Sequence, residues 1–317
     1  MSLGAIPGTG PNTSPLPIIR KSKKKTMADL PTGRTLVMGI LNVTEDSFSD
    51  GGKYLSADAA IDQGLKLLYS GADIIDVGGE STRPGAKDVD PALEQERIIP
   101  VIEALVKAGA VISVDTMHVS TARAAIEAGA HIINDVSGLT YEQGMPELIA
   151  ETGVPYVLMH RRGTAQNMVA EANYQDVVAE VIGELRGLRD EFVAKGVAPE
   201  QIIIDPGLGF AKDAEHNWAL LANVPAMEEL GHRVLIGTSR KRFLGELLAE
   251  GSKSRAPLER DAATAATTVL GAGAMFTLYT YVAPVLTELT GASNTFIAMS
   301  LALIGIGFTV GNGIGGR

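Results

Sequence analysis

Polar side chains recur at one kind of position in this chain, directly after short apolar runs. They are Asn42, Asp76, Asp115, Asn134, His160, Asp205 and Ser239. Carboxylates accept hydrogen bonds and an amide both donates and accepts, so such a set could read the edge of a flat polar ligand. Any one of them could simply cap the helix that follows it. Seven at equivalent positions indicate a shared site.

A group of cations follows the last of these apolar runs. In "VLIGTSRKRFLG", residues 234–245, Ser239 is followed by Arg240, Lys241 and Arg242, although the formal net charge of the chain is −10. We expect this segment to face an anionic or electron-rich ligand. The family resemblance described below implies that Ser239 and Lys241 face the ligand, whereas Arg240 would form an ion pair and Arg242 would lie at the surface.

A repeating strand-and-helix pattern must position these residues. The apolar runs lie at residues 35–43, 73–79, 111–116, 131–138, 155–160, 201–210 and 233–239. Their nearly continuous Val, Ile and Leu content is typical of parallel strands that are buried on both faces. Helix-forming segments separate them, which predicts an α/β fold of the TIM (β/α)8 type rather than an open sheet. The carboxyl ends of all barrel strands meet at one face, where barrel active sites lie.

Composition sets limits on the remaining classes. The chain has no cysteine, which excludes disulfides and zinc–thiolate sites and is compatible with a cytoplasmic location. The isoelectric point near 5.1 argues against a nucleic-acid-binding surface. Residues 1–33 are rich in Pro and Gly and carry the basic cluster "RKSKKK", so we expect a disordered arm there. The barrel is expected to span residues 34–270.

Seven motifs, over about residues 34–270, together resemble the dihydropteroate synthase family in its actinobacterial form. They are "GILNVTEDSFSDGG" (39–52), "GGESTRPGA" (78–86), "SVDT" (113–116), "NDVSG" (134–138), "LMH" (158–160), "DPGLGF" (205–210) and "SRKRFLG" (239–245). The resemblance implies a transferase of folate biosynthesis. It would condense 6-hydroxymethyl-7,8-dihydropterin pyrophosphate with p-aminobenzoate and release pyrophosphate.

The resemblance also implies roles for single residues. Asp115, Asn134, Asp205 and Lys241 would bind the pterin, and Ser239 would lie beside the lysine. Met159 and Phe210 would flank the ring as apolar walls.

The second substrate and the leaving group would be served by other loops. Thr82 and Arg83 match substrate-contacting positions of the family, while Phe48 and Pro84 would line the p-aminobenzoate pocket, where sulfonamides also bind. Asn42 matches the residue associated with Mg²⁺ and pyrophosphate. The residues predicted to act in catalysis are Asn42, Thr82, Arg83 and Lys241.

The chain departs from the family near its end. Family members bind pyrophosphate with an Arg-x-His pair after the eighth strand, but no histidine follows His232 and the last arginine before Arg317 is Arg260. This departure predicts impaired turnover. Residues 271–317 are instead apolar and resemble a fragment of a major-facilitator efflux permease, with two stretches near 275–289 and 296–310. The tail could supply strand eight, form a helical pair that contacts a membrane or a partner, or remain disordered, and we favour helices.

Two alternative functions stay open at this point. A pterin-dependent methyltransferase of the same barrel superfamily would share Asp115, Asn134 and Asp205 but would not need "STRPGA" or "SRK". A barrel that binds pterin or sulfonamide without catalysis would keep the pocket and lack turnover. Family members are often homodimers, so a homodimer is the expected assembly.

Overall fold

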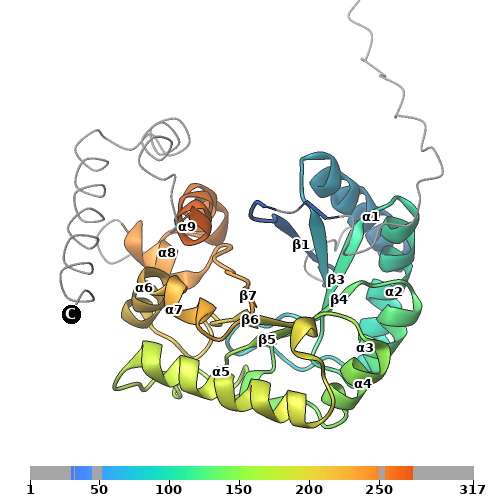
Figure 1. The fold of residues 1–317 in the computed structure, drawn as a ribbon. Coiled ribbons are helices and arrows are strands. Elements are labelled where there is room, and N and C mark those ends of the chain that lie inside the picture. The colour runs from blue at the N-terminus through green and yellow to red at the C-terminus, as the bar shows by residue number, and fades with distance from the viewer. Residues whose placement is uncertain (1–29, 32, 45–51, 250–253, 274–317) are drawn as a thin grey trace, which may run out of the picture.

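The computed structural model describes residues 30–31, 33–44, 52–249 and 254–273. Within them, seven parallel strands form one curved sheet in the order β1-β2-β3-β4-β5-β6-β7. Figure 1 shows helices packed around the outside of this sheet. The α/β fold of TIM-barrel type is therefore confirmed. The arm at 1–29, Phe48 and the tail at 274–317 lie outside the described residues.

Each strand is short. The strands are β1 (Met38–Asn42), β2 (Ile74–Gly78), β3 (Val111–Asp115), β4 (Ile132–Asp135), β5 (Tyr156–Met159), β6 (Ile202–Asp205) and β7 (Arg233–Val234). All residues of β2, β4 and β5 are buried, as the continuous apolar runs predict.

The helices follow the strands in the expected alternation. They are α1 (Gly52–Tyr69), α2 (Pro91–Lys107), α3 (Val119–Glu127), α4 (Met145–Thr152), α5 (Val177–Ala194), α6 (Ala214–Ala222), α7 (Val224–Glu228), α8 (Arg242–Leu247) and α9 (Asp261–Gly273). Local sequence fixes several starts. Asp90 caps α2 by accepting a hydrogen bond from the Ala92 amide, and Asp176 caps α5 through the Val178 and Ala179 amides.

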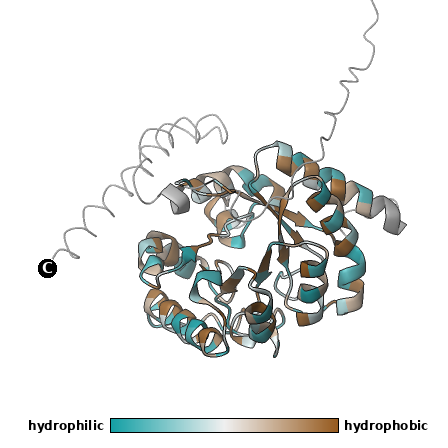
Figure 2. Cartoon of the chain, turned by 45° about the vertical axis from the view of Figure 1, so that its right-hand side comes forward, coloured by the Kyte–Doolittle hydropathy of each residue, from teal (hydrophilic) through white to brown (hydrophobic). Residues whose placement is uncertain are grey.

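Strand residues pack in two directions. One set faces the helices, including Ile75, Val77 and Ile112, and belongs to the main hydrophobic core. The alternate set faces the barrel interior, where Ile74 and Ile132 form a smaller apolar cluster with their neighbours. Figure 2 shows the apolar strands enclosed by helices with hydrophilic outer faces. The interior cluster forms a floor below the carboxyl ends of the strands.

The sheet is regular from β1 to β6 and becomes irregular at β7. The prediction for the seventh strand, residues 233–239, was too long, because only Arg233 and Val234 pair with β6. In the described part of the chain, β1 and β7 do not pair with each other. As a result, Ile40 of β1 is 47% exposed. We call this open side of the barrel, between β1 and β7, the seam.

Candidate active site

A cavity of about 2190 Å³ opens at the carboxyl ends of the strands and continues along the seam. Every described residue that the sequence assigns to substrate, metal or catalysis lines it. They are Asn42, Thr82, Arg83, Pro84, Asp115, Asn134, Met159, Asp205, Phe210, Ser239 and Lys241. The predicted residues therefore converge on one cavity, although they span some 200 positions of the chain.

The deepest polar group of the cavity comes from three neighbouring strands. Parallel register places Gly78, Asp115 and Asn134 side by side at the ends of β2, β3 and β4. The Asn134 amide donates to the Asp76 carboxylate at 3.0 Å. That bond fixes the orientation of the amide, so its oxygen is the atom available to a ligand.

A second polar group lies across the cavity at the end of β6. The Gly207 amide donates to the Asp205 carboxylate at 2.7 Å, which holds the side chain at the strand end. Lys241 extends over the Phe210 ring, with its ammonium nitrogen 4.1 Å from the ring centre. This distance suits a cation–π contact. Gly209 permits that approach, because a Cβ there would lie 3.0 Å from the Lys241 Cδ.

Burial dominates the electrostatics of these groups. It raises the pKa of Asp205 to about 6, against the opposing effects of the Gly207 amide, Lys241 and Lys212. It lowers the pKa of Lys241 to about 8, although Asp205 and Asp115 favour the charged form. Burial also raises the pKa of Asp115 well above its usual range, and the nearby Asp76 charge adds to that shift. Two close buried carboxyls resist double ionisation, so Asp76 and Asp115 can present a donor as well as acceptors.

Several acceptors in this cavity are left without a partner. Asp76 Oδ1, Asp115 Oδ1 and Asn134 Oδ1 are buried and accept no hydrogen bond of ordinary geometry from the described residues, although the Ser113 hydroxyl lies near enough to Asp76 to oppose the rise that burial causes in the pKa of that carboxyl. A buried polar atom without a hydrogen bond is costly, so such atoms point to a ligand that supplies the donors. The cavity is thus suited to a flat heterocycle with N–H groups along one edge.

Residues 38–277 match the protein family described as pterin binding enzymes. That match covers most of the chain. The chain belongs to this family. It is 51% identical over 238 residues to the dihydropteroate synthase of Mycobacterium leprae (strain TN), covering 74% of this chain and 84% of the relative.

Solved structures agree with this assignment. The Xanthomonas albilineans dihydropteroate synthase with 4-aminobenzoic acid is 43% identical, with a TM-score of 0.70, covering 76% of this chain and 85% of that one. The same enzyme in complex with 7,8-dihydropteroate is 38% identical, with a TM-score of 0.69, covering 83% and 95%. The resemblance of residues 271–317 to an efflux permease finds no support in these comparisons. In the described part of the chain, no helix is both long and apolar enough to span a bilayer.

The cations after β7 divide as the sequence predicts. Arg240 pairs with Asp261 at 2.6 Å, and the Arg242 side chain is 80% exposed and pairs with Glu246. These ion pairs hold both arginine side chains away from Asp115 and Asn134. Arg83 is exposed on the cavity wall and has no ion pair with a described residue.

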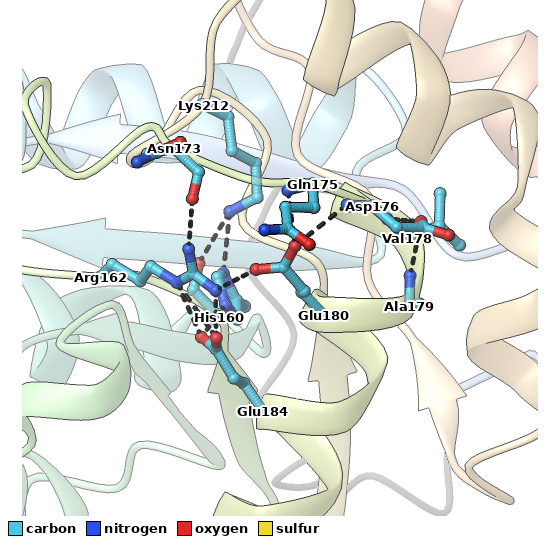
Figure 3. A network of polar contacts seen from close by, with 10 residues as sticks. All are labelled: His160, Arg162, Asn173, Gln175, Asp176, Val178, Ala179, Glu180, Glu184 and Lys212. Atoms are coloured by element: carbon cyan, nitrogen blue, oxygen red, sulfur yellow. Dashed lines mark hydrogen bonds and ion pairs between the residues drawn. The ribbon is translucent and has the colours of Figure 1, made fainter.

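Sequence reasoning gave no role to Lys212 and did not connect it with His160, which was noted only at the end of a strand. Lys212 lines the cavity, is 9% exposed and contacts His160, which is fully buried. Figure 3 shows both in a polar network with Arg162 and Glu184. Asp76 was noted at a strand end but given no role, and it orients Asn134. Nothing in the "GFAK" segment distinguishes Lys212 from a surface lysine, whereas its burial does.

Proposed function

We propose that this chain is a dihydropteroate synthase, which joins 6-hydroxymethyl-7,8-dihydropterin pyrophosphate to p-aminobenzoate. The supporting observation is the set of three unpartnered acceptors, on Asp76, Asp115 and Asn134, in the same cavity as Asp205 and Lys241. A pterin carries an exocyclic amine and ring N–H groups on one edge, which complements these oxygens. Solved relatives hold 4-aminobenzoic acid and dihydropteroate, in agreement with this proposal.

In the proposed reaction, the C–O bond to pyrophosphate breaks and its electron pair leaves with the pyrophosphate. The amine of p-aminobenzoate then forms the new C–N bond and loses a proton to solvent. Asp115, Asn134 and Asp205 would hold the pterin, with Met159 and Phe210 against its faces. This arrangement keeps the electrophilic carbon in a fixed place for the incoming amine.

The second substrate would bind nearer the opening of the cavity. Pro84 and Ser239 are the described candidates to contact p-aminobenzoate, together with Phe48 from outside the described residues. Thr82 and Arg83 would contact the substrates from the β2–α2 loop. A sulfonamide would compete for the same place.

Asn42 would contribute an amide oxygen to Mg²⁺. The described residues contain no cluster of three His, Cys, Asp or Glu side chains that could hold a metal alone. A single neutral oxygen fits Mg²⁺, which takes most of its ligands from phosphate and water. The ion would neutralise charge on the departing pyrophosphate.

A pterin-binding barrel without turnover is the second candidate. The sequence has no Arg-x-His pair after Arg260, so nothing in it matches the two leaving-group donors that the family resemblance implies. Loss of one such donor commonly reduces rate by about 10²–10³-fold. Turnover can therefore be slow even if the pterin site is intact, so we expect a pterin-binding assay to test the proposed site more directly than a turnover assay.

The test combines a binding assay with a release assay. Titration with 6-hydroxymethyl-7,8-dihydropterin should show binding by the wild type and a loss of about 10–100-fold in Asp115→Asn or Asn134→Leu. Asp190→Asn, an exposed change on α5, is the matched control and should bind as the wild type does. Pyrophosphate release that depends on p-aminobenzoate would identify the synthase. Binding without release would favour the second candidate, and absence of binding would refute both.

A further inference from the structure

The polar network behind the cavity wall contains a buried lysine that the proposed reaction does not use. Lys212 Nζ lies 2.9 Å from His160 Nδ1, 2.9 Å from the Phe210 carbonyl oxygen and 3.4 Å from the His160 carbonyl oxygen. Three acceptors match the three protons of an ammonium. All of its donors are therefore used inside the protein, although the residue lines the cavity.

The histidine in this network has a defined protonation state. Its Nε2 lies 2.8 Å from Glu184 Oε2, while its Nδ1 faces the ammonium. The Glu184 carboxylate can only accept, so Nε2 of a neutral ring carries the proton and Nδ1 carries the lone pair that accepts from Lys212. Burial lowers the pKa of Lys212 to about 7, against the opposing effect of the Asp205 charge, so this assignment rests on Glu184 and does not require a fully charged lysine. Burial, followed by the Lys212 charge, lowers the pKa of His160 to about 4, in agreement with a neutral ring.

The outer end of the network is anchored on α5. Arg162 donates from Nε to both Glu184 oxygens at 3.1 Å and pairs with Glu180 at 2.9 Å (Figure 3). Its guanidinium also stacks on the Tyr174 ring at 4.1 Å. Burial would raise the pKa of Glu184, but its bonds to His160 and Arg162 lower it to about 2. Glu184 is therefore a fixed acceptor for the His160 proton.

The inner end of the network holds the loop that follows β6. The His160 amide donates to the Asp205 carbonyl at 2.9 Å, so β5 and β6 stay paired up to the cavity. Gly207 lies so close to His160 that a Cβ would come within 1.9 Å of its carbonyl oxygen. Lys212 then joins that carbonyl to the carbonyl of Phe210. One side chain thus ties down a loop that carries both Asp205 and Phe210.

We propose that Lys212 is a positioning residue, held by neutral His160, that fixes Asp205 and Phe210 in place to bind the pterin. This inference rests on the proposed function, because it assigns those two residues to the pterin. It adds a dependence of ligand affinity on a residue pair whose polar contacts are made within the protein. The charge of Lys212 also favours the ionised form of Asp205, alongside Lys241 and against Asp76.

The experiment uses the full chain and 6-hydroxymethyl-7,8-dihydropterin as the probe. His160→Leu removes the ring nitrogen that accepts from Lys212 but leaves the two carbonyl acceptors. His160→Asn retains an oxygen near the place of Nδ1 but cannot reach Glu184. We expect His160→Leu and Lys212→Met to weaken binding about tenfold or more, since hydrogen bonds to charged groups are involved. His160→Asn should stay within about threefold of the wild type.

A second readout separates positioning from general damage. Asp205 must be ionised to accept the pterin N–H groups, and its pKa is about 6. Lys212→Met removes a nearby positive charge, so the pH below which binding weakens should move upward. The charged groups that face Lys212 are Asp205, Lys241, Glu184 and Arg162, and all four remain in this variant.

The outcomes are distinct. If folded His160→Asn binds as weakly as His160→Leu, or Lys212→Met binds as the wild type does, the positioning role is refuted. If Lys212→Met does not fold, the two His160 variants still decide. If the wild type itself binds no pterin, the proposed function fails first, independently of Lys212.

Discussion

The two sides of this barrel are built differently. Strands β2 to β5 are paired on both sides and buried, and the Asp115 and Asn134 group projects from their ends. At the seam, β7 has two residues, Ile40 is half exposed, and α8 and α9 follow irregular segments. The fully paired side carries the Asp115 and Asn134 oxygens, whereas Ser239 and Lys241, proposed for the same ligands, follow β7 at the seam. We therefore expect pterin binding to draw on both sides and turnover to depend more on the seam, so that turnover can be impaired while binding remains.

The largest expected effect comes from rebuilding the seam. Replacement of residues 271–317 by a family-type eighth strand and helix with an Arg-x-His pair should increase pyrophosphate release at least about 10²-fold, because each restored donor stabilises the leaving charge. Pterin affinity should change little. Equal release by the original and rebuilt chains would show that the missing pair is not limiting.

Truncation of a large side chain should lower the free energy of unfolding far more on the fully paired side than at the seam. Phe192 of α5 is fully buried and stacks on Tyr156 at 5.0 Å between ring centres. Phe192→Ala should lower the free energy of unfolding by about 3–5 kcal/mol in urea titrations. Leu258, beside the seam, is 73% exposed. Leu258→Ala should stay within about 0.5 kcal/mol, and a larger loss there would mean that the seam is covered.

The pH dependence of pterin binding should have two limits. Below pH about 6 Asp205 gains a proton and can no longer accept from the ligand, so affinity should fall. Burial lowers the pKa of Lys212 to about 7 and that of Lys241 to about 8, so affinity should fall again as these two side chains lose their charge. Titrations across this range test both limits. Lys241→Met should lack the loss of affinity near pH 8, and a loss that persists near pH 7 would belong to Lys212.

The smallest effect is expected at the ion pair between Arg240 and Asp261. Their side chains are 46% and 56% exposed, so water screens the attraction. Arg240→Gln should cost about 0–1 kcal/mol in thermal unfolding and should leave pterin affinity unchanged. A large loss of affinity would place Arg240 in the binding site and contradict its assignment to a structural ion pair with Asp261.

Sequence patterns predicted the fully paired strands, β2 to β6, better than the seam. Continuous apolar runs predicted the buried strands, and the polar residues that end these runs predicted Asp115, Asn134 and Asp205. The end of an apolar run marks both where the buried strand stops and where its last side chains reach the cavity. The run at 233–239 has the same composition, yet only two residues pair with β6. Strand formation there depends on a partner at the open edge, which composition does not report.

The network of Lys212 and His160 was beyond sequence reasoning for another reason. Its members lie 52 positions apart, on consecutive strand-and-helix units. The position of His160 after a strand marked it for the shared site, but nothing in the sequence connects it with Lys212. Only the packing of the β6–α6 loop against β5 brings them together. The role of Asp76 was missed similarly, since one carboxyl oxygen orients Asn134 while the other is left for a ligand, and the sequence shows neither contact.

On the interior face of β4, the apolar Ile132 is followed by the polar Asn134, and this change would limit how far a ligand ring can enter the barrel. A ring that enters the barrel can descend only until its donor-bearing edge meets the oxygens, because the aliphatic side chains beneath offer nothing polar. In a pterin, the carbon that bears the reactive methylene is on the opposite side of the bicycle. A pterin whose donor-bearing edge contacts these oxygens would thus direct its leaving group away from the barrel floor. The leaving group would face the open end of the cavity, where a second molecule can enter.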